Sequence, residues 1–221
     1  MFEYKHLDSD GKIIDLPVGK VVCVGRNYMQ HIKELDNDIP SEPLLFTKPS
    51  TALSALNRPV VIPKNLGPCH NELEVAILIN SRLCQSSIED AEAAIWGIGL
   101  GLDLTLRDVQ SALKKQGHPW ERAKAFDHSC PMSQFVVMEK MGPLSSIDFS
   151  LNVNDEIRQQ GNSQEMLFSI LKLLVNISNT FTLLPGDIVM TGTPKGVAAL
   201  LVDDQLTIEL NGHFSVRTHV V

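Results

Sequence analysis

The chain has 221 residues, of which 43% are hydrophobic and 20% charged, and its 19 basic and 26 acidic residues give a formal net charge of −7 at pH 7. This composition is typical of a globular domain, and the acidic balance argues against a nucleic-acid partner, which would require clustered Lys and Arg. No apolar stretch approaches the ~20 residues of a bilayer span, so we expect no membrane partner.

The cysteines and the N-terminus indicate a reducing compartment. Cys23, Cys69, Cys84 and Cys130 stand far apart without a C-x-x-C pair, which argues against a disulfide scaffold and a zinc knuckle. The first six residues lack the basic-then-apolar pattern of a signal peptide. We therefore expect a cytoplasmic protein. Because the sequence contains no linker or repeat, residues 1–221 are expected to form a single domain.

The first predicted elements in chain order are a hairpin, a strand, a helix and a second strand. Residues 1–20 predict a small hairpin that turns at Asp10-Gly11. Residues 21–25 predict a buried strand, and residues 27–35 a short helix. Residues 72–79 predict a strand that starts at a polar rim, where polar and apolar residues alternate, and then runs into the core.

The middle of the chain predicts a helix, a strand and a second helix. Ser87 and Asp90 have the spacing of a capping box, which indicates a helix that continues to Ile95. Residues 98–106 alternate with period two and predict a strand. Residues 107–116 predict a helix that ends at Gly117.

The last third predicts a helix followed by strands. Ser163 is expected to cap a helix over residues 164–179, and Pro185-Gly186 to turn into a strand over 187–191. Asn211-Gly212 predicts a two-residue turn between strands 205–210 and 213–220. Many short strands with few helices predict a β-rich α+β fold with an antiparallel or mixed sheet.

Three acidic residues form the clearest candidate site. Glu72 and Glu74 project from the same face of their strand, roughly 6.5–7 Å apart, and Asp103 lies on the polar face of the next predicted strand. Three carboxylates make an all-oxygen site, which suits Mg²⁺ or Mn²⁺ better than Zn²⁺. The alternative is that the two glutamates are simply solvated on a half-exposed strand.

A second candidate is the pair His31 and Glu34. On a helix these residues are i,i+3 neighbours, so the carboxylate can orient the imidazole as a general base. The alternative is an ordinary surface His–Glu pair.

Six motifs in order resemble the fumarylacetoacetate hydrolase superfamily, in its short single-domain branch of acylpyruvases. They are residues 25–34 (GRNYMQHIKE), 70–74 (HNELE), 101–105 (GLDLT), 120–127 (WERAKAFD), 158–162 (RQQGN) and 185–197 (PGDIVMTGTPKGV). The resemblance implies a mixed β-sandwich roll of the family's C-terminal-domain type with a few short helices. It also implies a homodimer that binds Mg²⁺, with Mn²⁺ as a substitute.

The resemblance also implies residue roles. It assigns metal binding to Glu72, Glu74 and Asp103, and catalysis to His31, Glu34 and Lys124. It assigns substrate contacts to Arg26, Arg107, Gln110 and Thr193. The distal pocket is expected from loops around residues 36–45 and 114–126.

The implied activity is Mg²⁺-dependent hydrolysis of the C–C bond of acylpyruvates, a class of 2-oxo acids that includes acetylpyruvate and fumarylpyruvate. The alternative is decarboxylation or keto–enol tautomerisation of oxaloacetate, because all three reactions pass through a similar enolate. Fumarylacetoacetase and ring-cleavage isomerase or decarboxylase activities are less favoured. A non-catalytic metal-binding protein on the same fold would need neither His31 nor Lys124.

Overall fold

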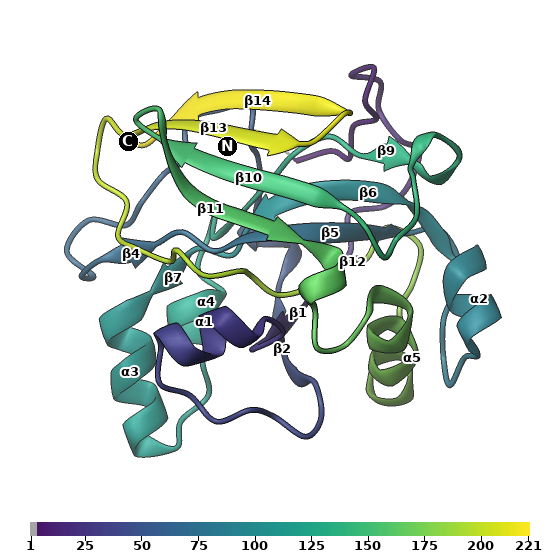
Figure 1. Ribbon diagram of the computed structural model, residues 1–221, viewed down its shortest axis with the longest axis horizontal. Helices are drawn as coiled ribbons and strands as arrows, with labels where there is room; N and C mark the ends of the chain where they lie inside the picture. Colours follow the sequence, from purple (N-terminus) through teal and green to yellow (C-terminus); the bar gives the residue numbers. More distant parts are fainter. Residues whose placement is uncertain (1–3) are drawn as a thin grey trace.

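The computed structural model describes residues 4–221, and its strands form three sheets (Figure 1). The large sheet contains β1 (Val21–Gly25), β2 (Leu44–Lys48), β3 (Leu53–Ala55), β5 (Leu73–Ile79), β6 (Ile95–Leu102), β8 (Cys130–Met132), β9 (Val136–Val137) and β12 (Ile188–Met190). The four-stranded sheet contains β10 (Asp148–Val153), β11 (Glu156–Asn162), β13 (Gln205–Leu210) and β14 (Phe214–His219). A two-stranded ladder joins β4 (Cys69–His70) to β7 (Thr105–Leu106).

The helices among the described residues are short. They are α1 (Met29–Glu34), α2 (Ile88–Ala93), α3 (Arg107–Gln116), α4 (Glu121–Lys124) and α5 (Ile170–Thr180), with 3₁₀ turns at Ser50–Ala52, Met138–Lys140 and Ser163–Glu165. In Figure 1, α1, α3 and α4 gather at one end of the molecule and α2 and α5 at the other. The candidate site lies at the α1–α3–α4 end.

The large sheet is mixed, as the sequence predicted. Its strands follow the order β2-β1-β12-β5-β6-β8-β3, with β9 paired to β6 beside that path. β1 runs parallel to β12, and β3 parallel to β8, whereas β5 pairs antiparallel with both β12 and β6. This strand-rich mixed fold with few short helices confirms the predicted fold class.

The two faces of β5 show how the sheets pack. Leu73, Val75 and Ile77 join the apolar core that the four-stranded sheet covers, and the alternate residues Ala76 and Leu78 join a second apolar cluster on the other face. That second cluster contains residues of both β1 and β3, which are near opposite ends of the strand order. The large sheet therefore curls around it. Glu74 occupies the same face as Ala76 and Leu78, at the point where the curled sheet opens.

Several predicted elements are confirmed. β1 has the predicted bounds, as does α3, which ends at Gly117 in the left-handed region (φ 67°). The Ser87–Asp90 capping box begins α2. Near the N-terminus, the amide of Gly11 donates to the carbonyl of Asp8 (2.9 Å), so the predicted turn is present. The beginning of that hairpin's first arm lies outside the described residues.

Other predicted elements have different boundaries. The helix predicted over 164–179 begins only at Ile170, because Met166 is extended and bridges to Tyr28. Ser163 does not cap that helix, since its hydroxyl donates to the carbonyl of Leu144 (2.8 Å). The helix predicted over 27–35 forms only over Met29–Glu34.

The strand predicted over 98–106 is interrupted, and β6 already begins at Ile95, where a helix was expected to continue. β6 ends at Leu102 and β7 begins at Thr105. The amide of Asp103 still donates to the carbonyl of Glu72 (2.8 Å), in register with the β5–β6 pairing, whereas the amide of Leu104 donates to the carbonyl of Ser129 (3.0 Å). The continued register places Asp103 opposite Glu72.

Two hairpins correct the sequence interpretation. The β13–β14 loop has three residues rather than two, because Leu210 pairs with Phe214. The β10–β11 hairpin was missed, since its turn residues Asn154 and Asp155 both adopt positive φ (53° and 65°) without the glycine that usually marks such a turn.

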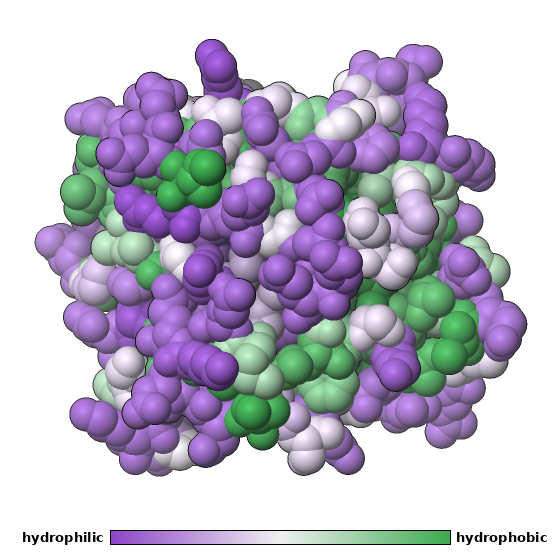
Figure 2. Space-filling model, viewed as in Figure 1, coloured by the Kyte–Doolittle hydropathy of each residue, from purple (hydrophilic) through white to green (hydrophobic). Residues whose placement is uncertain are grey.

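Hydrophilic side chains cover most of the face shown in Figure 2, and the broadest group of apolar residues lies beside α2 and α5. Among residues 4–221, no helix has the length and apolar character that crossing a membrane requires. All four cysteines are free thiols, three of them buried and Cys84 exposed.

Candidate active site

An open cleft of about 670 Å³, counted with the solvent at its mouth, lies between α1, α3 and α4 and the adjoining ends of β5 and β6. Every predicted site residue except Glu34 lines it: Arg26, His31, Glu72, Glu74, Asp103, Arg107, Gln110, Lys124 and Thr193. Asn37, Leu44, Lys114 and Trp120 also line it, from the two loop regions expected to build the distal pocket. The structure thus brings together residues that are far apart in the sequence.

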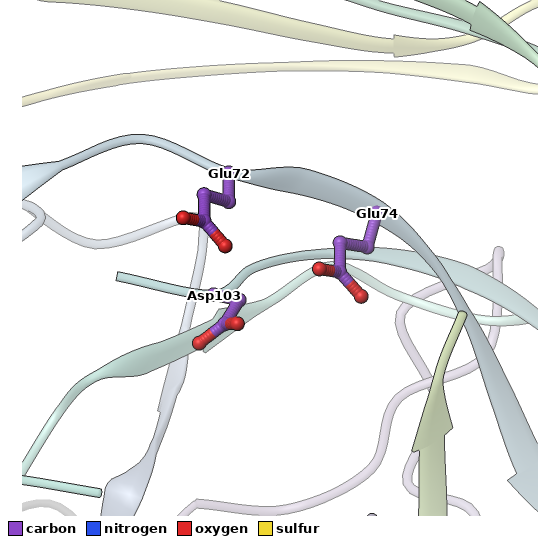
Figure 3. A group of neighbouring side chains, drawn as sticks. All are labelled: Glu72, Glu74 and Asp103. Carbon is purple, nitrogen blue, oxygen red and sulfur yellow. The ribbon is translucent and has the colours of Figure 1, made fainter. Parts of the chain in front are cut away.

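Three carboxylates converge in the depth of the cleft (Figure 3). Glu72 immediately precedes β5, Glu74 lies in it, and Asp103 immediately follows β6. Each offers an oxygen within 4.8 Å of the other two, and the residues are only 4%, 2% and 1% exposed. The alternative of two solvated glutamates is therefore wrong, because antiparallel pairing of β5 with β6 buries all three side chains together.

Cationic side chains surround these carboxylates. The ammonium of Lys124 lies between two of them, 2.7 Å from Glu72 Oε2 and 2.5 Å from Asp103 Oδ2. The guanidinium of Arg107 donates to Glu72 Oε1, and its other arm donates to Gln110 Oε1 (2.7 Å). The inner end of the cleft is the name we give to Glu72, Glu74, Asp103 and Lys124 together with the two other cations that pair with them, Lys48 and Arg107.

Lys48, at the end of β2, contacts the acidic triad and was not identified as a site residue from the sequence. Its side chain is completely buried, and its Nζ lies 2.8 Å from Asp103 Oδ1. It also donates to the carbonyls of Lys124 and Ser129. A lysine after the apolar run Leu44–Phe46 resembles the end of an ordinary edge strand, so no local signal distinguishes it.

The electrostatics differ between the two glutamates. Burial alone would raise the pKa of Glu72, but the ammonium of Lys124 and the guanidinium of Arg107 outweigh it and hold that pKa below its ordinary value. The pKa of Glu74 is raised well above its ordinary value, by burial and then by the charges of Asp103 and Glu72. The negative charges around Glu74 are therefore not fully balanced by nearby cations.

The acidic triad has the chemistry of a divalent-cation site. Asp103 Oδ1 is buried without a hydrogen bond among the described residues, because Lys48 is near it but poorly aligned. An oxygen without a hydrogen bond, undercompensated negative charge and an all-carboxylate donor set together fit a hard divalent cation such as Mg²⁺ or Mn²⁺.

The predicted motif around Thr193 forms hydrogen bonds with Glu74 and with the start of β5. The amide of Gly192, at φ 96°, donates to Glu74 Oε2 (2.7 Å). The hydroxyl of Thr193 donates to the carbonyl of Leu73 (2.8 Å) and accepts from Gln159 Nε2 (2.8 Å). Gln159 also accepts from the amide of Leu73 (2.8 Å), so it fixes both the start of β5 and Thr193. Gln159 lies within the recognised 158–162 motif, but that motif did not reveal its role.

His31 and Glu34 form a pair on α1. His31 Nδ1 lies 3.4 Å from Glu34 Oε2, and Glu34 accepts from the amide of Gly196 (3.0 Å). His31 lines the cleft and is only 6% exposed, so the alternative of a surface pair is wrong for the histidine. Burial lowers the pKa of His31, against the opposing effect of Glu72 and Glu34. The imidazole is therefore neutral and able to accept a proton at neutral pH.

The mouth of the cleft carries two further cations, Arg26 and Lys114. Arg26 has a positive φ of 58° and donates to the carbonyl of Asp38 (3.3 Å). Lys114, on α3, donates to Asn37 Oδ1 (3.0 Å). We call Arg26 and Lys114 the mouth cations.

Comparison with known proteins identifies relatives over almost the whole chain. A family model described as "Fumarylacetoacetate (FAA) hydrolase C-terminal" matches residues 20–221. The oxaloacetate tautomerase YcgM of Escherichia coli (strain K12) is 49% identical over 219 residues, which cover 99% of this chain and 100% of that protein. A mitochondrial oxaloacetate decarboxylase of Dictyostelium discoideum is 40% identical over 179 residues, which cover 80% of this chain and 82% of that protein.

Among solved structures, a fumarylpyruvate hydrolase from Pseudomonas aeruginosa in complex with Mn²⁺ and pyruvate superimposes with a TM-score of 0.92. The two are 32% identical, and the match covers 100% of this chain and 97% of that one. This similarity agrees with the predicted fold.

Proposed function

Because the chain belongs to the fumarylacetoacetate hydrolase family, we propose that it is a metal-dependent enzyme that interconverts the keto and enol forms of oxaloacetate. The observation that carries this proposal is the ammonium of Lys124 between two buried carboxylates at the inner end of the cleft. Support also comes from the 49% identical Escherichia coli relative, whose name states this reaction. Tautomerisation thus takes precedence over acylpyruvate hydrolysis, which was the first expectation from the sequence.

The reaction moves a proton between C3 and the 2-oxygen, so the site must stabilise negative charge on that oxygen. Mg²⁺ held by Glu72, Glu74 and Asp103 would act as a Lewis acid on the 2-oxo group. Lys124 stays protonated, because Asp103 and Glu72 outweigh the effect of burial and raise its pKa. Two of its three N–H groups are used by those carboxylates, and the third remains to hydrogen-bond the enolate oxygen.

His31 is the candidate base. Its Nδ1 faces Glu34, which leaves Nε2 as the acceptor when Nδ1 carries the proton. From the keto form, Nε2 takes a proton from C3, the C–H electron pair becomes the C2=C3 bond, and the C2=O π pair moves to the 2-oxygen. That oxygen is then protonated from water, and His31 returns its proton to the solvent. Glu34 holds the imidazole in this tautomer, so we propose it as an orienting residue.

Two other reactions use the same inner end. Hydrolysis of an acylpyruvate needs a base that activates water, which the His31–Glu34 pair can provide, and the similar Pseudomonas aeruginosa structure is a fumarylpyruvate hydrolase. Decarboxylation of oxaloacetate produces a comparable enolate, and the Dictyostelium discoideum relative is named for it. Both are second candidates.

The test is a three-substrate comparison with pure protein. Decay of the enol absorbance of oxaloacetate measures tautomerisation, and pyruvate formation from oxaloacetate measures decarboxylation. Pyruvate release from acetylpyruvate and fumarylpyruvate measures hydrolysis. Each assay is run with Mg²⁺, with Mn²⁺ and with EDTA.

We expect metal-dependent enol decay at a rate well above pyruvate formation from any of the three substrates. Pyruvate release that exceeds enol decay would instead assign hydrolysis or decarboxylation to the same site. Enol decay that persists in EDTA would contradict the metal requirement. The homodimer and the cytoplasmic location expected from the sequence remain proposals, to be checked by light scattering and by cell fractionation.

A further inference from the structure

The mouth cations have no acidic partner in the part of the chain that the structure describes. Among residues 4–221, neither Arg26 nor Lys114 forms an ion pair with a carboxylate, although both line the cleft. Their contacts are neutral: Arg26 donates to the carbonyl of Asp38 and Lys114 to the side-chain oxygen of Asn37. These contacts hold the two cations at the cleft without neutralising them.

At the inner end the charged groups are equal in number, although none of the cations there forms an ion pair with Glu74 among the described residues. Three carboxylates, Glu72, Glu74 and Asp103, are matched there by the three cations Lys48, Arg107 and Lys124. A divalent cation on the triad would leave that region with an excess of two positive charges. The single carboxylate of a 2-oxo monoacid offsets one of these and leaves both mouth cations without an anion.

Lys114 lies on the same side of α3 as Arg107, and it is also close to Arg26. Arg107, Gln110 and Lys114 are spaced by three and four residues, so they share one face of α3. Arg107 contacts Glu72 in the depth of the cleft, and Lys114 stands about 10.5 Å further along the helix axis. Burial, and then the nearby charges of Arg26 and Arg107, lower the pKa of Lys114. Cations from two segments thus converge on one space.

We propose that Arg26 and Lys114 bind the distal carboxylate of a short 2-oxo dicarboxylic acid and make the cleft select dicarboxylates over 2-oxo monoacids. The orientation rests on the proposed function, which places the 2-oxo end of the substrate at the inner end of the cleft. A carboxylate between a guanidinium and an ammonium accepts charge-assisted hydrogen bonds, which are stronger than neutral ones. Asn37 and Asp38 are the positioning residues for this subsite.

The test compares two ligands that differ only at their distal end. 2-Oxoglutarate and 2-oxopentanoate have the same five carbons, but the first ends in a carboxylate and the second in a methyl group. Isothermal titration calorimetry with Mg²⁺-loaded protein measures their affinities without turnover. Wild type should bind 2-oxoglutarate at least about 10-fold more tightly, as charge-assisted hydrogen bonds predict.

The variants are Lys114→Met, which keeps the apolar stem, and Arg26→Asn, because asparagine tolerates the positive φ at this position. Each should remove most of the preference and change 2-oxopentanoate affinity less than about twofold, because the distal methyl makes no charge-assisted bond. Lys115→Met is the matched control, since Lys115 is an exposed neighbour on α3 that does not line the cleft. It should retain the full preference.

Equal binding of the two ligands by wild type would overturn the proposal, as would an unchanged preference in both cleft variants. The outcome is separable from the proposed function. A protein that prefers the dicarboxylate but does not accelerate enol decay would retain the subsite and lose the tautomerase assignment. Rapid enol decay without the preference would do the reverse.

Discussion

The inner end and the mouth of the cleft hold their charged side chains in opposite ways. At the inner end, Lys48, Lys124 and Asp103 are at most 3% exposed and are bound directly to groups of opposite charge or to carbonyls. At the mouth, Arg26 and Lys114 are more exposed, and among residues 4–221 their hydrogen bonds go to neutral oxygens. The inner end is therefore fixed by the fold, whereas the mouth cations retain their charge for a ligand.

This difference determines what a substitution should change. Removal of a buried charge leaves its partner unpaired in a medium that solvates it poorly, so both chemistry and stability should respond. Removal of an exposed charge with neutral partners should leave stability almost unchanged and affect ligand binding alone. Four predictions test this contrast, in order of expected effect.

Lys124→Met should have the largest effect. We expect kcat for oxaloacetate tautomerisation to fall about 10³-fold, because the variant loses the donor to the enolate oxygen. Mn²⁺ affinity should not weaken, since the variant frees oxygens of Glu72 and Asp103. Steady-state kinetics and Mn²⁺ titration measure the two effects, with Lys140→Met on an exposed 3₁₀ turn as control. A parallel loss of Mn²⁺ binding would instead show that Lys124 organises the carboxylates.

Lys48→Met should mainly affect stability. The free energy of unfolding should fall by about 3 kcal/mol, because a buried ion pair loses one partner. For a chain of this length, that corresponds to a decrease in Tm of roughly 9 °C. Thermal unfolding followed by circular dichroism measures it, with Lys33→Met on the exposed side of α1 as control. Equal Tm values for the two variants would contradict the structural role of Lys48.

His31→Gln should reduce kcat about 100-fold and leave Mn²⁺ affinity unchanged, because it removes the proposed general base and none of the triad carboxylates. Burial lowers the pKa of His31, so the imidazole remains neutral below its ordinary pKa. In wild type, kcat/KM plotted against pH should therefore fall on the acidic side with an apparent pKa below about 6.5, the ordinary histidine value. His213→Gln, in the exposed β13–β14 loop, is the control. An acidic limb above that value would argue against His31 as the base.

Salt should have the smallest effect, and only at the mouth. Raising ionic strength from 0.05 to 0.5 M should increase KM for oxaloacetate about threefold, because exposed charges are screened. Lys114→Met should abolish most of that dependence and change the free energy of unfolding by less than about 0.5 kcal/mol. Kinetics at several salt concentrations and thermal melts provide both measurements. A salt dependence that persists in this variant would place the screened charge elsewhere.

The acidic triad could be recognised from the sequence because its members lie in or next to strands, where alternation fixes the face of each side chain. Glu72 and Glu74 are two residues apart, and Asp103 is close to the strand that pairs with theirs. His31 and Glu34 were accessible for a similar reason, since helical spacing makes i,i+3 residues neighbours. Lys48 has no such local relation to Asp103, because its contact depends on how the large sheet curls.

Some element boundaries are likewise set by the local sequence and others by tertiary contacts. α3 ends as predicted because Gly117 adopts the left-handed conformation that the local sequence specifies. The helix predicted from residue 164 begins at Ile170, because the bridge between Met166 and Tyr28 is a contact with a distant segment. Local patterns therefore located these two helices, and a tertiary contact shortened the second.

By itself the sequence determined the strand-rich class, the acidic triad and the His31–Glu34 pair, because these depend on local spacing and on motifs that resemble those of the family. Only the tertiary structure decided that the triad is buried, that Lys48 and Lys124 pair with its carboxylates, and that Arg26 and Lys114 share one cleft without an acidic partner among the described residues. Burial and charge balance are sums over residues from many segments. Their values are set when β5 and β6 pair and α3 packs beside them, which no local pattern records.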